Sequence, residues 1–287
     1  MMTCQGDAPN APLWQRLLSR CIQKCVCNWP FSRGKWRVLQ MARLASPFLM
    51  TQLDAGPWIR VSGASVFEWN AFRQRHKEPN TLATFMSLLQ SGMAVFDVGA
   101  NIGLFTLVAA SRVGAEGRVF AFEPTPLAFR RLLENVRLNG FTNITSLHSA
   151  VSDVVGIASF FVNPAPEDSE GNSLFASAVA PDSSEITVPV ATLDDVVRQM
   201  RFPGVDVLKI DVEGNEVRVL RGAHAILSGS HPPKILMEVN PLTLQAAGFD
   251  SDAVFLELTA LGYKWKTIEQ ISWRGCTIAN ILACREP

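Results

Sequence analysis

The 287-residue chain lacks a long hydrophobic run. A membrane-spanning helix needs roughly 18 to 20 consecutive apolar residues, and the longest apolar stretch, Ile102 to Ala110, suits a buried core helix instead. The N-terminus also lacks the basic start and uninterrupted apolar region of a secretory signal. We therefore expect a cytoplasmic protein.

The six cysteines do not suggest a disulfide framework in a chain of this length without a secretory signal. Cys21, Cys25 and Cys27 are clustered, but Asn28 stands where an iron–sulfur motif would need its third cysteine. A zinc site would need a fourth ligand from distant Cys4 or from a histidine. We expect reduced thiols and no metal at this cluster.

Acidic residues are missing from Ala8 to Leu53, a stretch that contains seven basic ones. With Asp7 included, residues 1–53 carry a charge of +6, and the remainder carries −6 because the whole chain is neutral. Three interpretations stay open: a basic flank on an acidic domain face, a surface for anionic lipid or a phosphate-bearing substrate, or an organelle transit peptide. No recognised nucleic-acid module accompanies the charge, so nucleic acid is not an expected partner. The basic residues are Arg16, Arg20, Lys24, Arg33, Lys35, Arg37 and Arg43.

The stretch from Val95 to Thr106 carries the strongest signal. An apolar strand ends near Asp97, a small-residue loop begins at Gly99, and an apolar helix follows at once. This order is typical of the first strand-to-helix turn of a doubly wound sheet. The next apolar strand, Arg118 to Phe122, ends in Glu123, where a carboxylate can accept hydrogen bonds from both hydroxyls of a ribose.

Two ligands fit such a turn, a dinucleotide and S-adenosylmethionine. The dinucleotide fingerprint needs a second glycine where Asn101 stands, and the carboxylate of Asp97 would repel a pyrophosphate. Asp97 instead suits the ammonium group of a methionyl moiety, directly or through water. The sequence favours S-adenosylmethionine, with a dinucleotide or a glycine turn that serves packing alone as the alternatives.

From Ala94 the chain alternates strands and helices, which indicates an α/β domain with a parallel sheet. We expect a seven-stranded, mostly parallel sheet flanked by helices over residues 81–287, closed by an antiparallel pair at 263–268 and 278–284. Residues 1–80 are expected to form a basic appendage with an amphipathic helix from Leu13 to Cys27 and a hairpin at 48–61.

Three further expectations concern single elements. A helix is predicted to run to Asn139, with Arg131 among its solvent-exposed residues. Another is predicted as one piece from Glu216 to Leu227. The long polar connection from Asn163 to Ser184 is predicted to be functional or disordered, because connections of that length are uncommon in compact domains.

The ordered motifs of the chain resemble those of the FkbM family of methyltransferases, over roughly residues 80 to 285. The resemblance implies a class I, Rossmann-like methyltransferase fold, S-adenosylmethionine as cofactor, and O-methylation of hydroxyls of sugars or polyketides. The motifs are Asp97–Gly103, Phe122–Pro124, Ala150–Asp153, Leu193-Asp194 and Leu208–Gly214.

The expected cofactor site combines the loop that begins at Gly99 with Glu123 at the end of the second strand. The family resemblance adds Ala150 and Val151. The expected cofactor-binding residues are Asp97, Gly99, Ala100, Asn101, Gly103, Glu123, Ala150 and Val151.

Catalysis needs an acceptor oxygen in line with the methyl group and, for a hydroxyl that is hardly ionised, a base. Asp211, at the end of the fourth strand, is the first candidate for base or acceptor-orienting group; its alternative role is to cap the following turn. Glu213 can face the same side, and Lys209 can pair with Asp211 or Glu238 or bind the acceptor.

A magnesium ion is the less favoured alternative. Asp211, Glu238 and Asn240 loosely resemble the magnesium-binding set of catechol-type methyltransferases, and oxygen ligands suit that ion. We expect catalysis without a metal.

The predicted function is O-methylation of a hydroxyl on a glycan, lipid-linked or secondary-metabolite acceptor, with peripheral membrane contact through the basic N-terminus. The alternatives are N-methylation of an amine and a non-catalytic, cofactor-binding scaffold. An intact loop together with Glu123 argues against the scaffold, because a dead site has no need of them. The acceptor and the oligomeric state do not follow from the sequence.

Overall fold

The computed structural model describes residues 12–28, 48–53, 56–62, 68, 78–163, 172–273 and 275–285. Its centre is a seven-stranded sheet in the order β11-β12-β10-β9-β3-β4-β5. The strands are β3 (Ala94–Val98), β4 (Arg118–Phe122), β5 (Ile144–Leu147), β9 (Val207–Ile210), β10 (Lys234–Val239), β11 (Lys264–Trp273) and β12 (Cys276–Cys284).

The pairing confirms the predicted mostly parallel sheet. Strands β5, β4, β3, β9 and β10 run parallel, and β12 lies antiparallel to both β10 and β11. The chain builds outward from β3 to β5 and then returns to place β9 on the other side of β3. In an open α/β sheet a ligand binds at this reversal, at the carboxyl ends of the strands.

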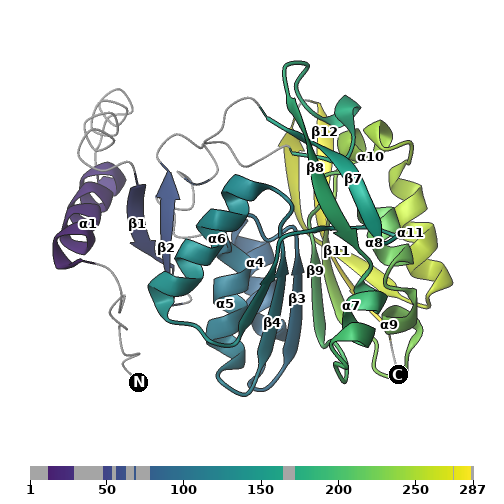
Figure 1. Cartoon of the computed structure of the whole chain (residues 1–287), viewed down its shortest axis with the longest axis horizontal. Helices are drawn as coiled ribbons and strands as arrows, with labels where there is room; N and C mark the ends of the chain where they lie inside the picture. The colour runs from purple at the N-terminus through teal and green to yellow at the C-terminus, as the bar shows by residue number, and fades with distance from the viewer. Residues whose placement is uncertain are drawn as a thin grey trace.

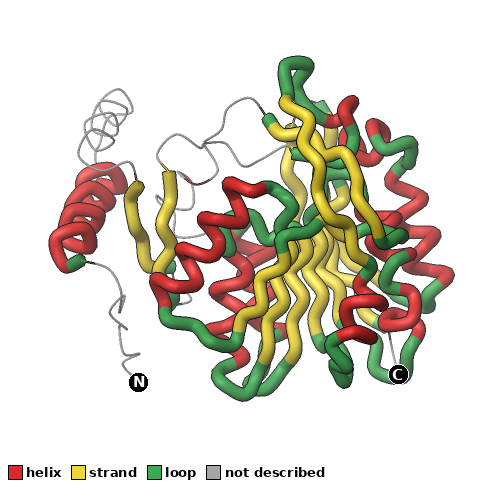
Figure 2. Tube along the Cα trace, viewed as in Figure 1, coloured by secondary structure: helices red, strands yellow, loops and turns green. Residues whose placement is uncertain are grey.

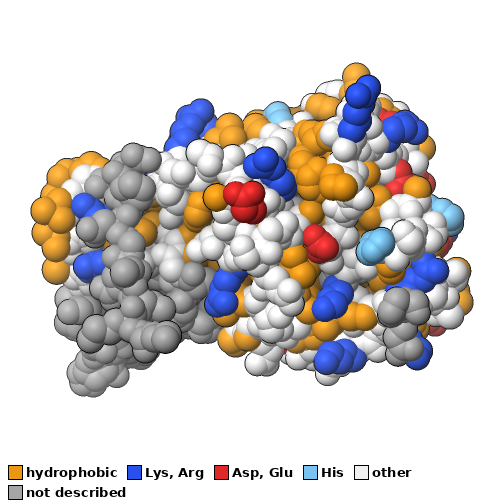
Figure 3. All heavy atoms as spheres, turned by 90° about the horizontal axis from the view of Figure 1, so that it is seen from below, with side chains coloured by type: hydrophobic (Ala, Val, Ile, Leu, Met, Phe, Trp, Pro, Cys, Tyr) orange, Lys and Arg blue, Asp and Glu red, His pale blue; other side chains and the backbone are white. Residues whose placement is uncertain are grey.

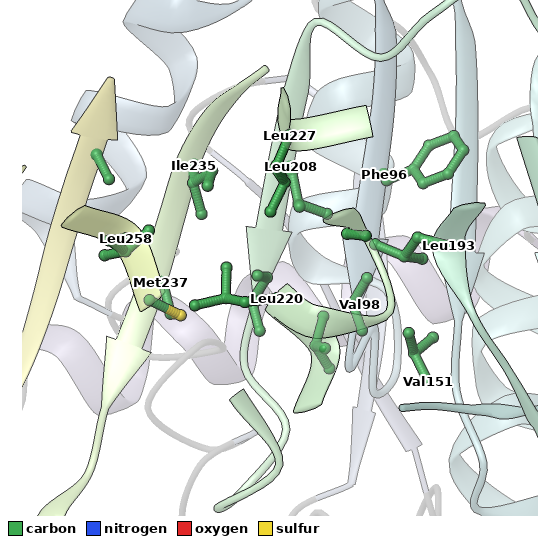
Figure 4. Packing of buried hydrophobic residues seen from close by; sticks show 14 of the residues in the cluster. Phe96, Val98, Val151, Leu193, Leu208, Leu220, Leu227, Ile235, Met237 and Leu258 are labelled. Carbon is green, nitrogen blue, oxygen red and sulfur yellow. The ribbon is translucent and has the colours of Figure 1, made fainter. Parts of the chain in front are cut away.

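Helices cover both faces of the sheet (Figures 1 and 2). On one side lie α4 (Pro79–Leu88), α5 (Leu104–Val113) and α6 (Pro126–Asn139), and on the other α7 (Leu193–Gln199), α8 (Glu216–Arg221), α9 (His224–Ser228), α10 (Pro241–Ala246) and α11 (Ser251–Ala260). Each layer buries its own apolar core. Figure 4 shows the second core, in which Leu208 and Ile235 of the sheet meet Leu220 and Leu258 of the helices.

A smaller sheet stands apart from the main one. It joins β6 (Ala150–Val151), β8 (Ser184–Ala191) and β7 (Gly156–Val162), with β7 and β8 antiparallel. A 3-10 turn, η1 (Ala176–Ala178), lies in the connection between β7 and β8. The sequence predicted strands at 158–162 and 186–190, which correspond to β7 and β8, but neither β6 nor the separation into a second sheet.

Two helix predictions were wrong in detail. Arg131 is buried rather than exposed, because its guanidinium pairs with the buried carboxylate of Glu68. The helix predicted from Glu216 to Leu227 is broken into α8 and α9 at Gly222. A Cβ on Gly222 would lie 2.0 Å from the carbonyl oxygen of Ser152, so the backbone of another segment occupies the space beside the break.

The predicted N-terminal helix and hairpin are both present, as α1 (Leu13–Asn28), β1 (Phe48–Gln52) and β2 (Trp58–Ser62). The hairpin is bonded to α6: the side-chain amide of Asn139 pairs with the backbone of Trp58, and Asn135 pairs with the backbone of Arg60. The basic residues Arg33, Lys35, Arg37 and Arg43 lie outside the described residues. No helix in the described part of the chain is long and apolar enough to cross a membrane.

Candidate active site

A cavity opens at the carboxyl ends of β3, β4 and β9, where the strand order reverses. It encloses about 920 Å³, part of it open to solvent. Its walls come from the loop after β3, the ends of β4 and β9, and the smaller sheet. The residues that line it include Gly99, Ala100, Asn101, Glu123, Ala150, Val151, Phe160, Asn172, Leu174, Lys209, Asp211 and Glu213.

The loop after β3 is held by hydrogen bonds within the protein. The amides of Gly99 and Ala100 both donate to the carbonyl oxygen of Phe122, at 3.0 and 2.9 Å. Gly99 has a φ of +80°, and a Cβ there would lie 1.8 Å from the carbonyl oxygen of Asp211. The glycine is therefore required by its positive φ and by the close approach of two protein backbones.

Glu123 lies buried at the tip of β4 with both carboxylate oxygens engaged. One oxygen accepts the amide hydrogen of Asn101 and the other that of Thr125, each at 2.8 Å. Burial raises the pKa of this carboxyl above its usual range, while the hydrogen bonds from Thr125 and Asn101 and the charge of Lys209 act in the opposite direction. The side chain is thus fixed in place on the cavity wall, and its predicted contact with a ribose stays a prediction.

Asp97 lies beneath the cavity rather than on its wall. It is fully buried; its Oδ2 accepts from the hydroxyl of Thr106 at 2.6 Å, and its Oδ1 lies 3.3 Å from the ammonium of Lys209. Contact with a methionyl ammonium, predicted for Asp97, is not tested by this arrangement and stays a prediction.

Gly103 also lies outside the residues that line the cavity. It has a φ of +97°, and a Cβ there would lie 2.6 Å from Cδ1 of Leu132 on α6. It therefore closes the loop against the neighbouring helix at the start of α5. Its predicted contact with the cofactor is not tested by this arrangement and stays a prediction.

Ala150 and Val151, from β6, also line the cavity. The side-chain amide of Asn215 donates to the carbonyl oxygen of Val151 at 2.7 Å. This bond ties the smaller sheet to the segment between β9 and α8. The two residues that the family motif suggested therefore lie in one cavity with Glu123.

Lys209, Asp211 and Glu213 form the other end of the cavity. The Lys209 ammonium donates to the carbonyl oxygen of Gly99 at 3.0 Å and lies 3.4 Å from Oδ2 of Asp211. Asp211 is 27% exposed, which leaves part of its carboxylate in contact with solvent. Glu213 has a φ of +51°, a conformation that costs free energy for a residue other than glycine and is often found at functional sites.

Glu238 lies on the wall of a smaller adjoining hollow of about 210 Å³ that also includes Lys209 and Asp211. Carboxylate oxygens of Asp211, Glu213 and Glu238 lie within 4.8 Å of one another, a spacing that could hold a cation. Asn240, predicted as the third magnesium ligand, instead caps α10 by accepting from the amide of Leu242. The ammonium of Lys209 beside Asp211 already places a positive charge in this group.

Sequence reasoning did not find the wall that comes from the smaller sheet. Phe160 on β7 and Asn172 and Leu174 in the following connection line the cavity. The hydroxyl of Ser173 bonds to the carbonyl oxygen of Glu213 at 2.8 Å, so the connection is held against the acidic end. In the sequence, only the unusual length of the 163–184 connection pointed to this wall. That length predicted that the connection is functional or disordered.

Glu216 lies shortly after Glu213 in the sequence and is buried at the start of α8. Its Oε1 accepts from the amide of Gly214 at 3.1 Å, and its Oε2 has no hydrogen-bond partner among the described residues. Burial raises the pKa of this carboxyl from 4.5 to about 7. The group therefore changes its protonation near neutral pH.

Comparison with known proteins agrees with this geometry. The model of a family described as the methyltransferase FkbM domain matches residues 97–265. The hexuronic acid methyltransferase AglP of Haloferax volcanii is 28% identical over 188 residues, which are 65% of this chain and 72% of that protein. The 31-O-demethyl-FK506 methyltransferase FkbM of Streptomyces tacrolimicus is 33% identical over 163 residues, 47% of this chain and 60% of its own.

Among solved structures, the crystal structure of methyltransferase FkbM from Methylobacillus flagellatus KT superposes with a TM-score of 0.49 and 18% identity. The match covers 77% of this chain and 53% of that one. The chain thus spans about half the length of this solved relative.

Proposed function

This chain belongs to the FkbM methyltransferase family, and on that premise we propose that it transfers the methyl group of S-adenosylmethionine to a hydroxyl group. The acceptor that we propose is a glycan or a secondary metabolite. The observation that carries the proposal is that Glu123 and Asp211 line one and the same cavity.

The residues of the cavity fit S-adenosylmethionine better than a dinucleotide. A carboxylate can accept about four hydrogen bonds, so Glu123 retains capacity for two ribose hydroxyls beside the amides of Asn101 and Thr125. A pyrophosphate would need unengaged loop amides, whereas those of Gly99 and Ala100 donate to Phe122. We propose that Ala150 and Val151 complete the cofactor wall.

When bound, S-adenosylmethionine supplies a methyl group on a sulfonium, and transfer forms a carbon–oxygen bond as the carbon–sulfur bond breaks. Asp211 is the proposed base, which takes the hydroxyl proton on its carboxylate as the acceptor oxygen attacks. Lys209 holds that carboxylate in position through its contacts with Asp211 and with the carbonyl oxygen of Gly99. Glu213 and Glu238 are proposed to accept hydrogen bonds from further hydroxyls of the acceptor.

The negative charge around Asp211 supports a neutral acceptor. Carboxylate oxygens of Asp211, Glu213 and Glu238 lie close together, and the Lys209 ammonium beside Asp211 is also paired with Asp97. A negatively charged acceptor would be repelled at such short range. We therefore propose neutral, hydroxyl-rich molecules, in contrast to the hexuronic acid in the name of the Haloferax relative.

A methyl-transfer assay tests the proposal. The purified protein is incubated with S-adenosylmethionine labelled in the methyl group and with neutral glycosides, uronides, polyketides, lipid-linked glycans and amines, and S-adenosylhomocysteine release is measured. We expect label on a hydroxyl oxygen of a neutral acceptor. Label on nitrogen would assign N-methylation, and cofactor binding by calorimetry without turnover on any acceptor would favour a non-catalytic role.

A further inference from the structure

Helix α1 turns apolar side chains toward solvent. Leu13, Trp14 and Leu17 are 63%, 57% and 52% exposed, and the neighbouring Cys21 is also exposed. At 3.6 residues per turn these four residues share one side of the helix. Figure 3 shows the resulting hydrophobic surface at the left-hand end of the molecule, where α1 lies in Figure 1.

The opposite side of α1 is fixed to the protein. The hydroxyl of Ser19 accepts the amide hydrogen of Met50 on β1 at 3.0 Å, and Ile22 is buried in the core with Leu18 packed against it. The helix therefore cannot turn its exposed apolar side inward without breaking these contacts. Single exposed apolar residues are ordinary, but a contiguous exposed set indicates an interaction surface.

Positive charge borders this apolar side. Arg20 is exposed, with its guanidinium 5.4 Å from the centre of the Trp58 ring, whereas Arg16, one turn earlier, is partly buried. The surrounding sequence from Ala8 to Leu53 contains no acidic residue. Leucine and tryptophan on one side of a helix with arginine beside them are the features of helices that lie in the interface of an anionic bilayer.

We propose that the exposed side of α1 docks on an anionic lipid surface, with Leu13, Trp14 and Leu17 inserted among the headgroups and the exposed Arg20 near the lipid phosphates. The proposal is independent of the proposed methyl transfer, because none of these residues lines the cavity. Apolar burial and charge attraction would both contribute, so binding needs anionic lipid and weakens as salt screens the charges.

The test is cosedimentation of the full chain with vesicles of phosphatidylcholine and phosphatidylserine, and with vesicles of phosphatidylcholine alone. We expect binding to the mixed vesicles at low salt, and its loss at high salt and on the uncharged vesicles. Replacing Leu13, Trp14 and Leu17 together by serine should reduce binding by about tenfold or more, because the insertable apolar area is removed. These side chains are exposed, so the melting temperature should remain unchanged.

A matched control removes three exposed apolar residues elsewhere. Val154, Val155 and Ile157 are 63%, 61% and 77% exposed, and their replacement by serine should leave vesicle binding unchanged. Equal loss in both triple variants, or failure of the unmodified protein to bind the mixed vesicles, would overturn the proposal. A dimer seen by light scattering that only the α1 variant abolishes would assign this side of the helix to a second copy of the chain and overturn it as well.

Discussion

Lys209 on β9 and Asp97 on β3 form an ion pair beneath the cavity, with 3.3 Å between Nζ and Oδ1. Their side chains are 7% and 0% exposed. The parallel pairing of β3 with β9 places the two residues directly opposite each other in register. The same ammonium also contacts the carbonyl oxygen of Gly99 and lies 3.4 Å from Asp211, so one buried cation links the loop after β3 to the proposed base.

Replacement of Lys209 by methionine should lower the free energy of unfolding by about 3 to 5 kcal/mol, because the carboxylate of Asp97 is left buried without its partner. The double variant with Asp97→Asn should recover part of the loss. Urea denaturation measures both. Arg198→Ala, which breaks an exposed ion pair with Asp195, should cost less than about 1 kcal/mol. If the two single variants were equally stable, Lys209 would not be compensating a buried charge.

Gly99→Ala should destabilise the protein by more than about 2 kcal/mol, because alanine is strained at positive φ and its Cβ would clash with the backbone of Asp211. Thermal unfolding checks this. The control is Gly156→Ala, where nothing lies within 4 Å of an added Cβ. Equal melting temperatures for the two variants would contradict the close backbone approach.

Glu123→Ala should weaken S-adenosylmethionine binding by about 1.5 to 3 kcal/mol, the range for hydrogen bonds to a charged group. Isothermal titration calorimetry measures the affinity. Because Glu123 also accepts two backbone amides, the melting temperature is recorded alongside it. Unchanged affinity in a folded variant would remove Glu123 from the cofactor site, and tight binding of NAD instead would contradict the proposed cofactor.

Asp211→Asn should reduce turnover by about 10²- to 10⁴-fold while cofactor affinity stays nearly unchanged, because the amide cannot accept the hydroxyl proton. Turnover is followed by S-adenosylhomocysteine release. Loss of cofactor binding together with a lowered melting temperature would favour the capping role. We also expect activity to survive EDTA, since the ammonium of Lys209 lies where it repels a divalent cation; activity restored only by magnesium would contradict this.

The free energy of unfolding should fall as the pH rises from 4.5 to about 7, because burial raises the pKa of Glu216 over that interval. Within it the folded protein binds a proton that the unfolded chain has released, so folding is favoured at the acidic end. Glu216→Gln should reduce the change in the free energy of unfolding across this pH interval by up to about 3 kcal/mol. Denaturation across this pH range tests it, with the partly exposed Glu134→Gln as the variant that should retain the slope.

Local sequence patterns were sufficient for the elements of the main sheet. The apolar runs that became β3, β4 and β5 and the helix start at Thr125-Pro126 are encoded within a few residues of each other. The antiparallel end pair and the N-terminal hairpin were equally local, since each joins neighbouring segments. The residues at the ends of β3, β4 and β9 were identified because parallel strands present their carboxyl ends at one edge.

What the sequence by itself determined is therefore the succession of strands and helices, the family, and the residues at the strand ends that border the cavity, such as Glu123 and Asp211. Tertiary structure alone decided which of these side chains face the cavity and which support it. Asp97 lies beneath the wall because Lys209, 112 positions away, occupies the space beside it, and Arg131 is buried because Glu68 lies opposite. Whether a side chain faces the cavity or supports it depends on partners that are distant in the sequence and meet only in the folded protein. A local sequence pattern therefore does not predict it.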